Sequence, residues 1–333
     1  MASLRTIFLS LSLTTAAVAG GLSLFAQGQM TKPLREPLPY WAYVVNPPAA
    51  AASSVPAADK TPLHVPGSDA VFTRAQVTDL YTPPDWHPAD HPAMPQIVAR
   101  GRSLEVYACG YCHLPNGQGR PENSSLAGLP AAYIAQQLAD FKSGLRKSSE
   151  PAHGPTNTMI KIGAHANEKE ISDAAAYFSA LKPTLWIRVV ETETVPKTHI
   201  AGWMLVADEP SEMEPIGQRI IETPENLERT ELRDDRSGFI AYVPVGSIEK
   251  GKALANVATK TLRCSTCHGR DLQGKGKAPR LAGRSPSYLV RQLYDMQSGA
   301  RAGAEVHVMK PVVAKLTVED MAAIAAYVAS LKP

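Results

Sequence analysis

The pentapeptides CGYCH at residues 109–113 and CSTCH at residues 264–268 are the most informative part of this sequence. Together they contain all 4 cysteines of the 333-residue chain, and a histidine follows the second cysteine both times. Two disulfides, a redox-active dithiol or a four-cysteine zinc site would each use the cysteines. None of these alternatives explains the two histidines.

Covalent attachment of haem explains every residue of the pattern. Two thiols form thioethers to the haem vinyl groups, and the residue after the second cysteine supplies the proximal imidazole to iron. The sequence therefore predicts two c-type haems. The predicted attachment residues are Cys109, Cys112, Cys264 and Cys267, and the predicted proximal ligands are His113 and His268.

Each pentapeptide lies inside a longer repeat. Shifting the chain by 155 residues aligns 109–144 with 264–299, and 14 of these 36 positions are identical. The register then changes to 150, which aligns Met159 with Met309 and the motif Leu-Lys-Pro at 181–183 with that at 331–333. A single matched repeat of this kind indicates a duplicated domain rather than a solenoid. We predict haem domains over residues 94–183 and 247–333.

Both copies have the pattern of helical domains. Asn167 followed by Glu170 is typical of a capping box, and the apolar residues after it recur at helical spacing. Thr317 precedes the equivalent helix in the second copy. A candidate helix also precedes each haem motif, starting near Pro95 in the first copy and capped by Ser247 in the second. The predicted class is mainly α: two cytochrome c-like helical haem domains.

Haem iron needs a second axial ligand or an open position. Met159 and Met309 occupy equivalent places in the repeat, 46 and 41 residues after their histidines, so we predict them as the distal ligands. His307 is the main rival in the second copy because it lies two residues from Met309. The other candidates fit less well, since Met296 aligns with a phenylalanine and two histidines lack counterparts: His153 and His165.

Three further segments lie outside the repeats. Residues 1–30 contain an apolar run from Ile7 to Ala26, which favours a transmembrane anchor, with a cleaved signal peptide as the alternative. Residues 31–93 are rich in proline and predict an extended tether, with a short helix near 72–80 and with Trp86 packed on the first haem domain. Either reading of the N-terminus exports the haem domains.

Residues 184–246 form an acidic insert between the copies, with 6 basic and 12 acidic side chains. Short apolar runs at 185–190, 200–206, 216–221 and 239–243 predict strands. The insert is therefore predicted to be a small β-rich unit. It could serve as a structural clamp between the haem domains or as a docking module for a partner.

Composition limits the classes of function. The chain is 44% hydrophobic and 20% charged, which excludes a disordered chain or a polytopic membrane protein, and its net charge of +3 does not favour nucleic acid. The second copy is different, with 14 basic and 6 acidic side chains. Its basic residues near the haem motif predict a docking surface for an acidic partner: Arg263, Arg270, Lys275, Lys277, Arg280 and Arg284.

Over residues 94–183 and 247–333 the chain resembles the tandem dihaem class I c-type cytochromes. The resemblance is carried by the two haem motifs, the Leu-Ala-Gly…Tyr…Gln-Leu…Gly-x-Arg segment, the downstream methionine and the final Ala-Tyr…Leu-Lys-Pro helix. It implies outer-sphere electron transfer through an exposed haem edge. It also places four side chains near the haem propionates: Tyr133, Arg146, Tyr288 and Arg301.

One departure from the family pattern distinguishes the two copies. The family usually has a proline just before the leucine of the Leu-Ala-Gly segment. The chain near that proline supplies a carbonyl to the proximal histidine. Pro279 fits this role in the second copy, but Ser124 stands at the equivalent place in the first. Because such a bond orients the imidazole and raises its basicity, we expect different surroundings for His113 and His268.

The predicted function is electron transfer between a respiratory-chain donor and a terminal oxidase or other acceptor. The predicted location is the periplasmic face of a bacterial inner membrane, held by the N-terminal segment, or the soluble periplasm after cleavage. The predicted partners are redox proteins, among them membrane respiratory complex subunits. A cytochrome subunit of a periplasmic dehydrogenase complex is the main alternative. A dihaem peroxidase is less favoured, because both copies keep a methionine at the same place.

Overall fold

The computed structural model describes residues 37–47, 60–258 and 260–333. Contacts divide the chain into Met1–Arg35 and Glu36–Pro333, and the description below concerns the second unit. The predicted anchor or signal segment, residues 1–30, lies outside the described residues. Among the helices that are described, none is both long enough and apolar enough to cross a bilayer.

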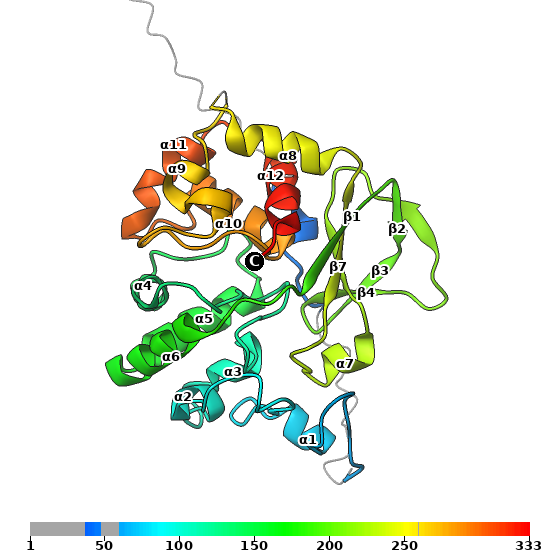
Figure 1. Cartoon of the computed structure of the whole chain (residues 1–333), viewed down its shortest axis with the longest axis vertical. Coiled ribbons are helices and arrows are strands. Elements are labelled where there is room, and N and C mark those ends of the chain that lie inside the picture. Colours follow the sequence, from blue (N-terminus) through cyan, green and yellow to red (C-terminus); the bar gives the residue numbers. More distant parts are fainter. Residues whose placement is uncertain (1–36, 48–59, 259) are drawn as a thin grey trace, which may run out of the picture. The chain divides into compact units, whose positions relative to one another are not determined.

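The first repeat copy is helical, as predicted (Figure 1). Its apolar side chains, among them Val98, Leu129 and Phe178, are fully buried and form one core beside the first haem motif. The helices that surround this core are α2 (Gln96–Ala99), α3 (Cys109–His113), α4 (Ala131–Lys142), α5 (Gly154–His165) and α6 (Glu168–Ala180).

The last helix of each copy begins with a capping box. The Glu170 N–H donates to Asn167 Oδ1 at 2.9 Å, and the Asn167 N–H donates to Glu170 Oε2 at 2.8 Å. Thr317 and Asp320 exchange the same pair of bonds at the start of α12 (Val318–Ser330). Each pair satisfies amide groups that have no partner within the helix. Both predicted helix starts are confirmed.

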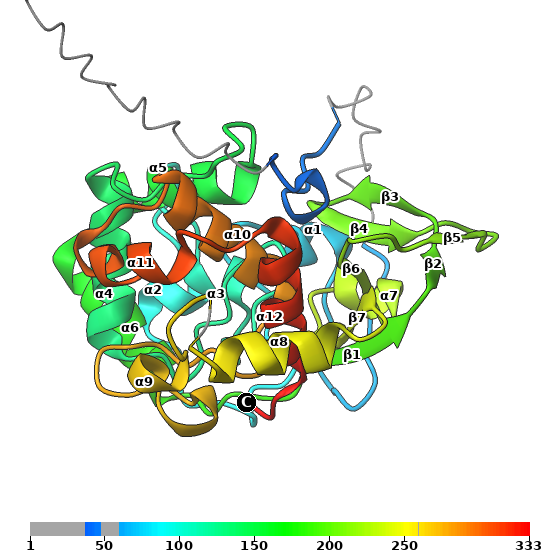
Figure 2. The same ribbon diagram turned by 90° about the horizontal axis from the view of Figure 1, so that it is seen from above.

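The second repeat copy has a longer helix before its haem motif. A Cβ at Gly251 of this helix, α8, would collide with the carbonyl oxygen of Ala323 in α12, so the glycine lets the two helices cross in contact (Figures 1 and 2). The prediction that Ser247 caps α8 is wrong, because the helix begins at Ser247 and its N-cap is Gly246, with a φ of +81°. The elements are α8 (Ser247–Asn256), α9 (Ser265–His268), η2 (Arg270–Leu272), α10 (Pro286–Ser298), η3 (Ala304–Val308), α11 (Lys310–Val313) and α12 (Val318–Ser330).

The segment between the copies contains strands, as predicted. One sheet has the order β1-β7-β6, in which β7 runs parallel to β1 and antiparallel to β6, and two hairpin-like pairs join β2 to β5 and β3 to β4. The elements are β1 (Ile187–Thr192), β2 (Thr194–Pro196), β3 (Thr198–Ala201), β4 (Met204–Ala207), β5 (Met213–Pro215), β6 (Ile221–Pro224), α7 (Leu227–Glu231) and β7 (Phe239–Pro244).

Two strand predictions in this insert are wrong in detail. The run 200–206 is not one strand, because Gly202 and Trp203, with φ of +57° and +67°, turn the chain between β3 and β4. The run 216–221 is mostly a turn, and only Ile221 belongs to β6. In the second run Ile216 and Ile220 are buried although they lie outside the strand, which is why the apolar pattern alone misplaced it.

In its described parts, residues 37–47 and 60–93, the proline-rich segment has little regular structure beyond the short elements η1 (Tyr40–Ala42) and α1 (Arg74–Val77). The expected short helix near 72–80 is therefore confirmed. Trp86 is 2% exposed, and its Nε1–H donates to the Leu232 carbonyl at 2.7 Å. Trp86 therefore packs on the insert, not on the first haem domain as predicted, because the insert supplies both an apolar cover and an acceptor for the indole.

Candidate haem sites

A backbone carbonyl of the first copy orients the predicted proximal histidine. His113 ends α3 and is 8% exposed, and its Nδ1 lies 2.8 Å from the carbonyl oxygen of Ser124. Because a carbonyl only accepts, Nδ1 carries the proton and the Nε2 lone pair is left for a metal. Burial lowers the pKa of His113 to about 4, so the imidazole is neutral at pH 7.

The second copy repeats this arrangement. His268 Nδ1 lies 2.8 Å from the Pro279 carbonyl, and burial again lowers the pKa of the histidine. The expectation that the missing proline alters this bond at His113 is wrong. The acceptor is a backbone oxygen in both copies, so a serine can supply it as well as a proline when the loop has the same course.

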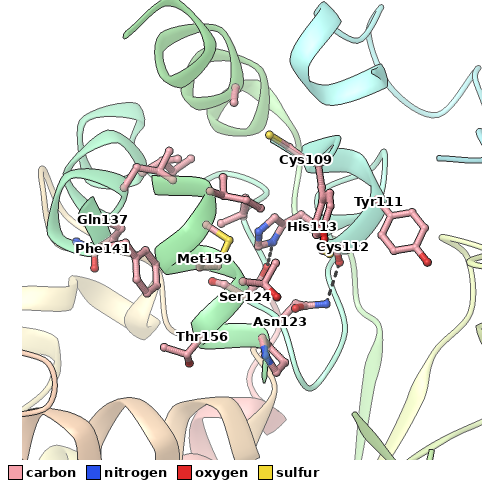
Figure 3. Close-up of a pocket in the computed structure, with 18 of the residues that line it drawn as sticks. Cys109, Tyr111, Cys112, His113, Asn123, Ser124, Gln137, Phe141, Thr156 and Met159 are labelled. Atoms are coloured by element: carbon pink, nitrogen blue, oxygen red, sulfur yellow. Dashed lines mark hydrogen bonds between the residues drawn. The ribbon is translucent and has the colours of Figure 1, made fainter. Parts of the chain in front are cut away.

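A cavity of about 410 Å³ lies beside the first haem motif. Cys109, Cys112, His113 and Met159 all line it, and Met159 enters from α5 while the other three come from α3 (Figure 3). The structure therefore brings together the four residues that the sequence predicts for one haem. Burial raises the pKa of Cys109 to about 12, so its thiol is neutral and lacks the thiolate character of a redox-active dithiol.

The second motif lies nearer to solvent. Cys264 is half-buried, Cys267 is exposed, and Met309 is half-buried where α11 begins. Met309 packs against the apolar core of this copy. His307 is exposed, and its Nδ1 lies 2.6 Å from the Ala304 carbonyl. Met309 is thus the more deeply placed of the two candidate ligands.

Two residues that sequence reasoning did not assign to the haem site also line the first cavity: His153 and Trp203. Trp203 reaches it from the β3–β4 turn of the insert, and a Cβ at Gly154 would collide with its indole ring. The sequence feature that could have indicated this turn is the pair Gly202–Trp203, which lies in a run predicted as a strand. His153 is 3% exposed, and burial lowers its pKa to about 3.

The two copies meet through a reciprocal cluster of arginine, tyrosine and glutamine side chains. Arg146 donates to Tyr288 Oη at 3.2 Å, and Arg301 donates to Tyr133 Oη at 3.0 Å. The chain segments beside them also pair, since the Lys147 N–H donates to the Ala300 carbonyl at 2.8 Å. The four side chains that the family resemblance assigns to the propionates therefore come together, and each arginine crosses to the other copy.

This cluster carries an excess of buried positive charge. Arg146 and Arg301 are 9% and 5% exposed, and their guanidiniums donate to glutamine and tyrosine side chains, which are uncharged. Burial raises the pKa of Tyr288, but the facing guanidiniums of Arg146, Arg284 and Arg301 outweigh it and bring the value to about 7. Buried guanidiniums need anionic partners. Haem propionates fit this requirement.

Two of the six basic residues predicted to form a docking surface are buried instead. Arg284 is 2% exposed and donates to Ser124 Oγ and the Ser125 carbonyl of the first copy. Arg280 is 4% exposed and donates to the Ala282 carbonyl. Both lie in the contact between the copies, where planar guanidiniums can bind several carbonyls at once, so their assignment to a docking surface is wrong.

Comparison with known proteins places this arrangement in a family. The cytochrome c family profile matches residues 98–182 and again residues 248–332. The chain belongs to the cytochrome c family. As a tandem c-type cytochrome it has two c-type haems, and its function is electron transfer.

Two curated relatives and one solved structure are similar over most of their length. Cytochrome c4 of Azotobacter vinelandii is 26% identical over 246 residues, which cover 72% of this chain and 91% of the relative. The thiosulfate dehydrogenase electron acceptor of Thiomonas intermedia is 26% identical over 68% of this chain and 79% of its own length. Cytochrome c4 of Acidithiobacillus ferrooxidans has a TM-score of 0.45 at 22% identity, covering 67% of this chain and 98% of that one.

Proposed function

We propose that this cytochrome is a periplasmic electron relay whose second haem exchanges electrons with a diffusing acidic redox protein. The observation that carries the proposal is the difference in cover between the two haem motifs. Trp203 and Arg233 of the insert lie over the first motif, and Arg233 stacks on Tyr111 at 3.4 Å. In the second motif Cys267 is exposed.

Each haem would be held by its own copy. Cys109, Cys112, His113 and Met159 would bind the first, and the second would be bound by Cys264, Cys267, His268 and Met309. The haem irons supply the one-electron chemistry. The chain keeps each proximal imidazole neutral and oriented, through the carbonyls of Ser124 and Pro279. Arg146 and Arg301 would bind propionates from both copies and so bring the two groups together.

Charge supports the second copy as the exchange site. Arg263, Arg270, Lys275 and Lys277 are exposed around the motif, and only Lys277 among them has a carboxylate nearby, Glu305 at 3.8 Å, within the described residues. A basic rim around an accessible haem edge accelerates association with an acidic partner, and salt weakens that effect. The acidic insert, by contrast, uses Glu222 and Asp234 in buried contacts, which favours its role as a clamp.

The experiment measures the rate of reduction by an acidic single-cofactor redox protein across a range of salt, with a small neutral reductant as comparison. We expect the protein-mediated rate to fall by roughly tenfold or more at high salt and to fall further in Lys275→Glu/Lys277→Glu. The matched control, Lys142→Glu/Lys169→Glu, changes two exposed lysines of the first copy. The control pair should leave the rate unchanged. A rate that ignores both salt and the Lys275→Glu/Lys277→Glu pair would overturn the exchange site at the second haem.

A fixed subunit of a dehydrogenase complex is the second candidate. It is favoured by the similarity to a relative named as a thiosulfate dehydrogenase electron acceptor. In that role the N-terminal segment and the insert would hold the chain against a partner that contains the catalytic cofactor. Copurification of a dehydrogenase chain in fixed ratio, together with salt-independent reduction, would distinguish this candidate from the diffusing relay.

A further inference from the structure

A group of three ligand-bearing side chains lies away from both haem motifs. His87 of the proline-rich segment meets Asp234 and Asp235, which follow α7 in the insert. One potential ligand atom from each lies within 4.8 Å of the other two. All three are buried, with exposed fractions of 4%, 1% and 2%. Charged groups are rarely so deeply buried unless they are paired or coordinate a metal.

Asp234 already has an ordered position. His87 Nε2 lies 3.0 Å from Asp234 Oδ1, and the Arg236 N–H donates to the same oxygen at 2.9 Å. The other oxygen, Oδ2, accepts from Arg229 Nε at 2.7 Å. The two bonds from Arg229 and Arg236 fix the direction of the carboxylate, as outer partners of a metal ligand do. The close contact with His87 Nε2 brings two proposed ligand atoms together.

Asp235 is the unexplained member of the group. Both of its carboxylate oxygens are buried without any hydrogen-bond partner among the described residues. A buried carboxylate without a donor costs free energy, and a cation beside Asp235 would supply the missing partner.

We propose that His87, Asp234 and Asp235 bind one divalent transition-metal ion of the zinc type. One imidazole with two carboxylates is a donor set suited to zinc, whereas sites without nitrogen favour magnesium or calcium. Bonds of about 2.1 Å place neighbouring ligand atoms about 3.0–3.4 Å apart, and the His87–Asp234 separation of 3.0 Å falls in that range. Asp235, which lies within 4.8 Å of the other two ligand atoms, would have to come closer, and a water would complete the shell.

The ion would join segments that are distant in the sequence. It would link the proline-rich segment through His87 to the insert through Asp234 and Asp235. That loop is attached in turn to the first haem motif, since Asn116 Nδ2 donates to the Asp235 carbonyl at 2.6 Å and Arg233 donates to the Tyr111 carbonyl at 2.7 Å. The role of the ion is therefore structural: it fastens the insert over the first haem.

The experiment titrates zinc chloride into the chelator-treated protein with both haems in place, at pH 7.5, by calorimetry. We expect one equivalent to bind more tightly than about 1 µM and Asp235→Asn to weaken binding by at least about 100-fold. The matched control is Asp208→Asn, which changes an exposed aspartate 2.8 Å from His199 in the same insert. It should leave the zinc affinity unchanged.

Zinc-edge absorption spectroscopy on the wild type gives a second readout that does not depend on a variant folding. It should show only nitrogen and oxygen neighbours, one of them an imidazole, and no sulfur. Wild-type protein that binds no zinc below micromolar concentration, or an Asp235→Asn variant that binds as well as wild type, would overturn the site. Sulfur neighbours would do the same, because none of the three proposed ligands contains sulfur.

Discussion

Arg146 of the first haem domain donates to the phenol of Tyr288 in the second at 3.2 Å, and Arg301 returns the contact to Tyr133 at 3.0 Å. The duplicated chain thus uses an arginine–tyrosine contact twice, and in each contact the two side chains come from different copies. Because both guanidiniums are buried, the contact between the copies is also the place where haem propionates would be neutralised. Redox chemistry and domain association would then share one set of side chains.

The first prediction concerns attachment. Denatured protein should keep both haems, seen as haem-stained bands and a mass excess of two haem groups, because thioethers survive unfolding. Replacing Cys264 and Cys267 by alanine should remove one haem and leave the other. A variant that still retains two haems after denaturation would contradict these attachment residues.

The second prediction concerns the distal ligand. Met309→Ala should lower the potential of one haem by roughly 100 mV or more, within the ~0.8 V range that axial ligands control. It should also open that iron to carbon monoxide, checked by optical spectra and redox titration. His307→Ala is the matched control and should change neither property, since His307 is exposed. The reverse result would make His307 the ligand.

The third prediction concerns the arginine cluster. Arg301→Gln removes a positive charge that favours the reduced haems, so at least one potential should fall. A unit charge at ~10 Å in a medium of effective dielectric ~20 is worth about 1–2 kcal/mol, which is several tens of millivolts. Redox titration checks this. Replacement of an exposed charge, as in Arg188→Gln, should shift neither potential measurably.

The fourth prediction concerns the tryptophan cover. Trp203→Ala should open the first haem cavity to water and small ligands while leaving the second haem unchanged. The reason is that Trp203 lies against Gly154 and lines the cavity that holds the first haem motif. Carbon monoxide binding and the two potentials would be measured. Equal effects on both haems would contradict the assignment.

The fifth prediction concerns acid stability. Burial holds the pKa of His153 at about 3 in the folded protein, whereas the unfolded value is about 6.5. The unfolded state therefore binds the additional proton as pH falls from 6.5 toward 3, and folding stability drops over that window by up to about 1.4 kcal/mol per pH unit. His153→Phe, which keeps a ring against Tyr43, should reduce the slope in denaturant titrations. An unchanged slope would count against a buried, neutral His153.

Local sequence was sufficient for much of this protein. The two CxxCH motifs, the repeat register and the capping residues Asn167 and Thr317 each depend on neighbours within a few positions, because helix starts and haem attachment are local chemistry. The cofactor, the helical class and the start of each final helix therefore followed from the chain alone. The absence of a proline at Ser124 led to a wrong expectation about His113, because the group that contacts the imidazole there is a backbone carbonyl.

Only the tertiary structure decided which side chains meet across the insert and between the copies. In the sequence, Arg280 and Arg284 belong to a group of basic residues typical of a solvated face. In the structure both are buried against the first copy. Trp203 reaches a haem cavity from a turn, and His87 meets Asp235 across 148 positions of sequence. Such contacts depend on how distant segments pack against one another. Neither hydrophobic periodicity nor a short motif shows which distant residues will meet.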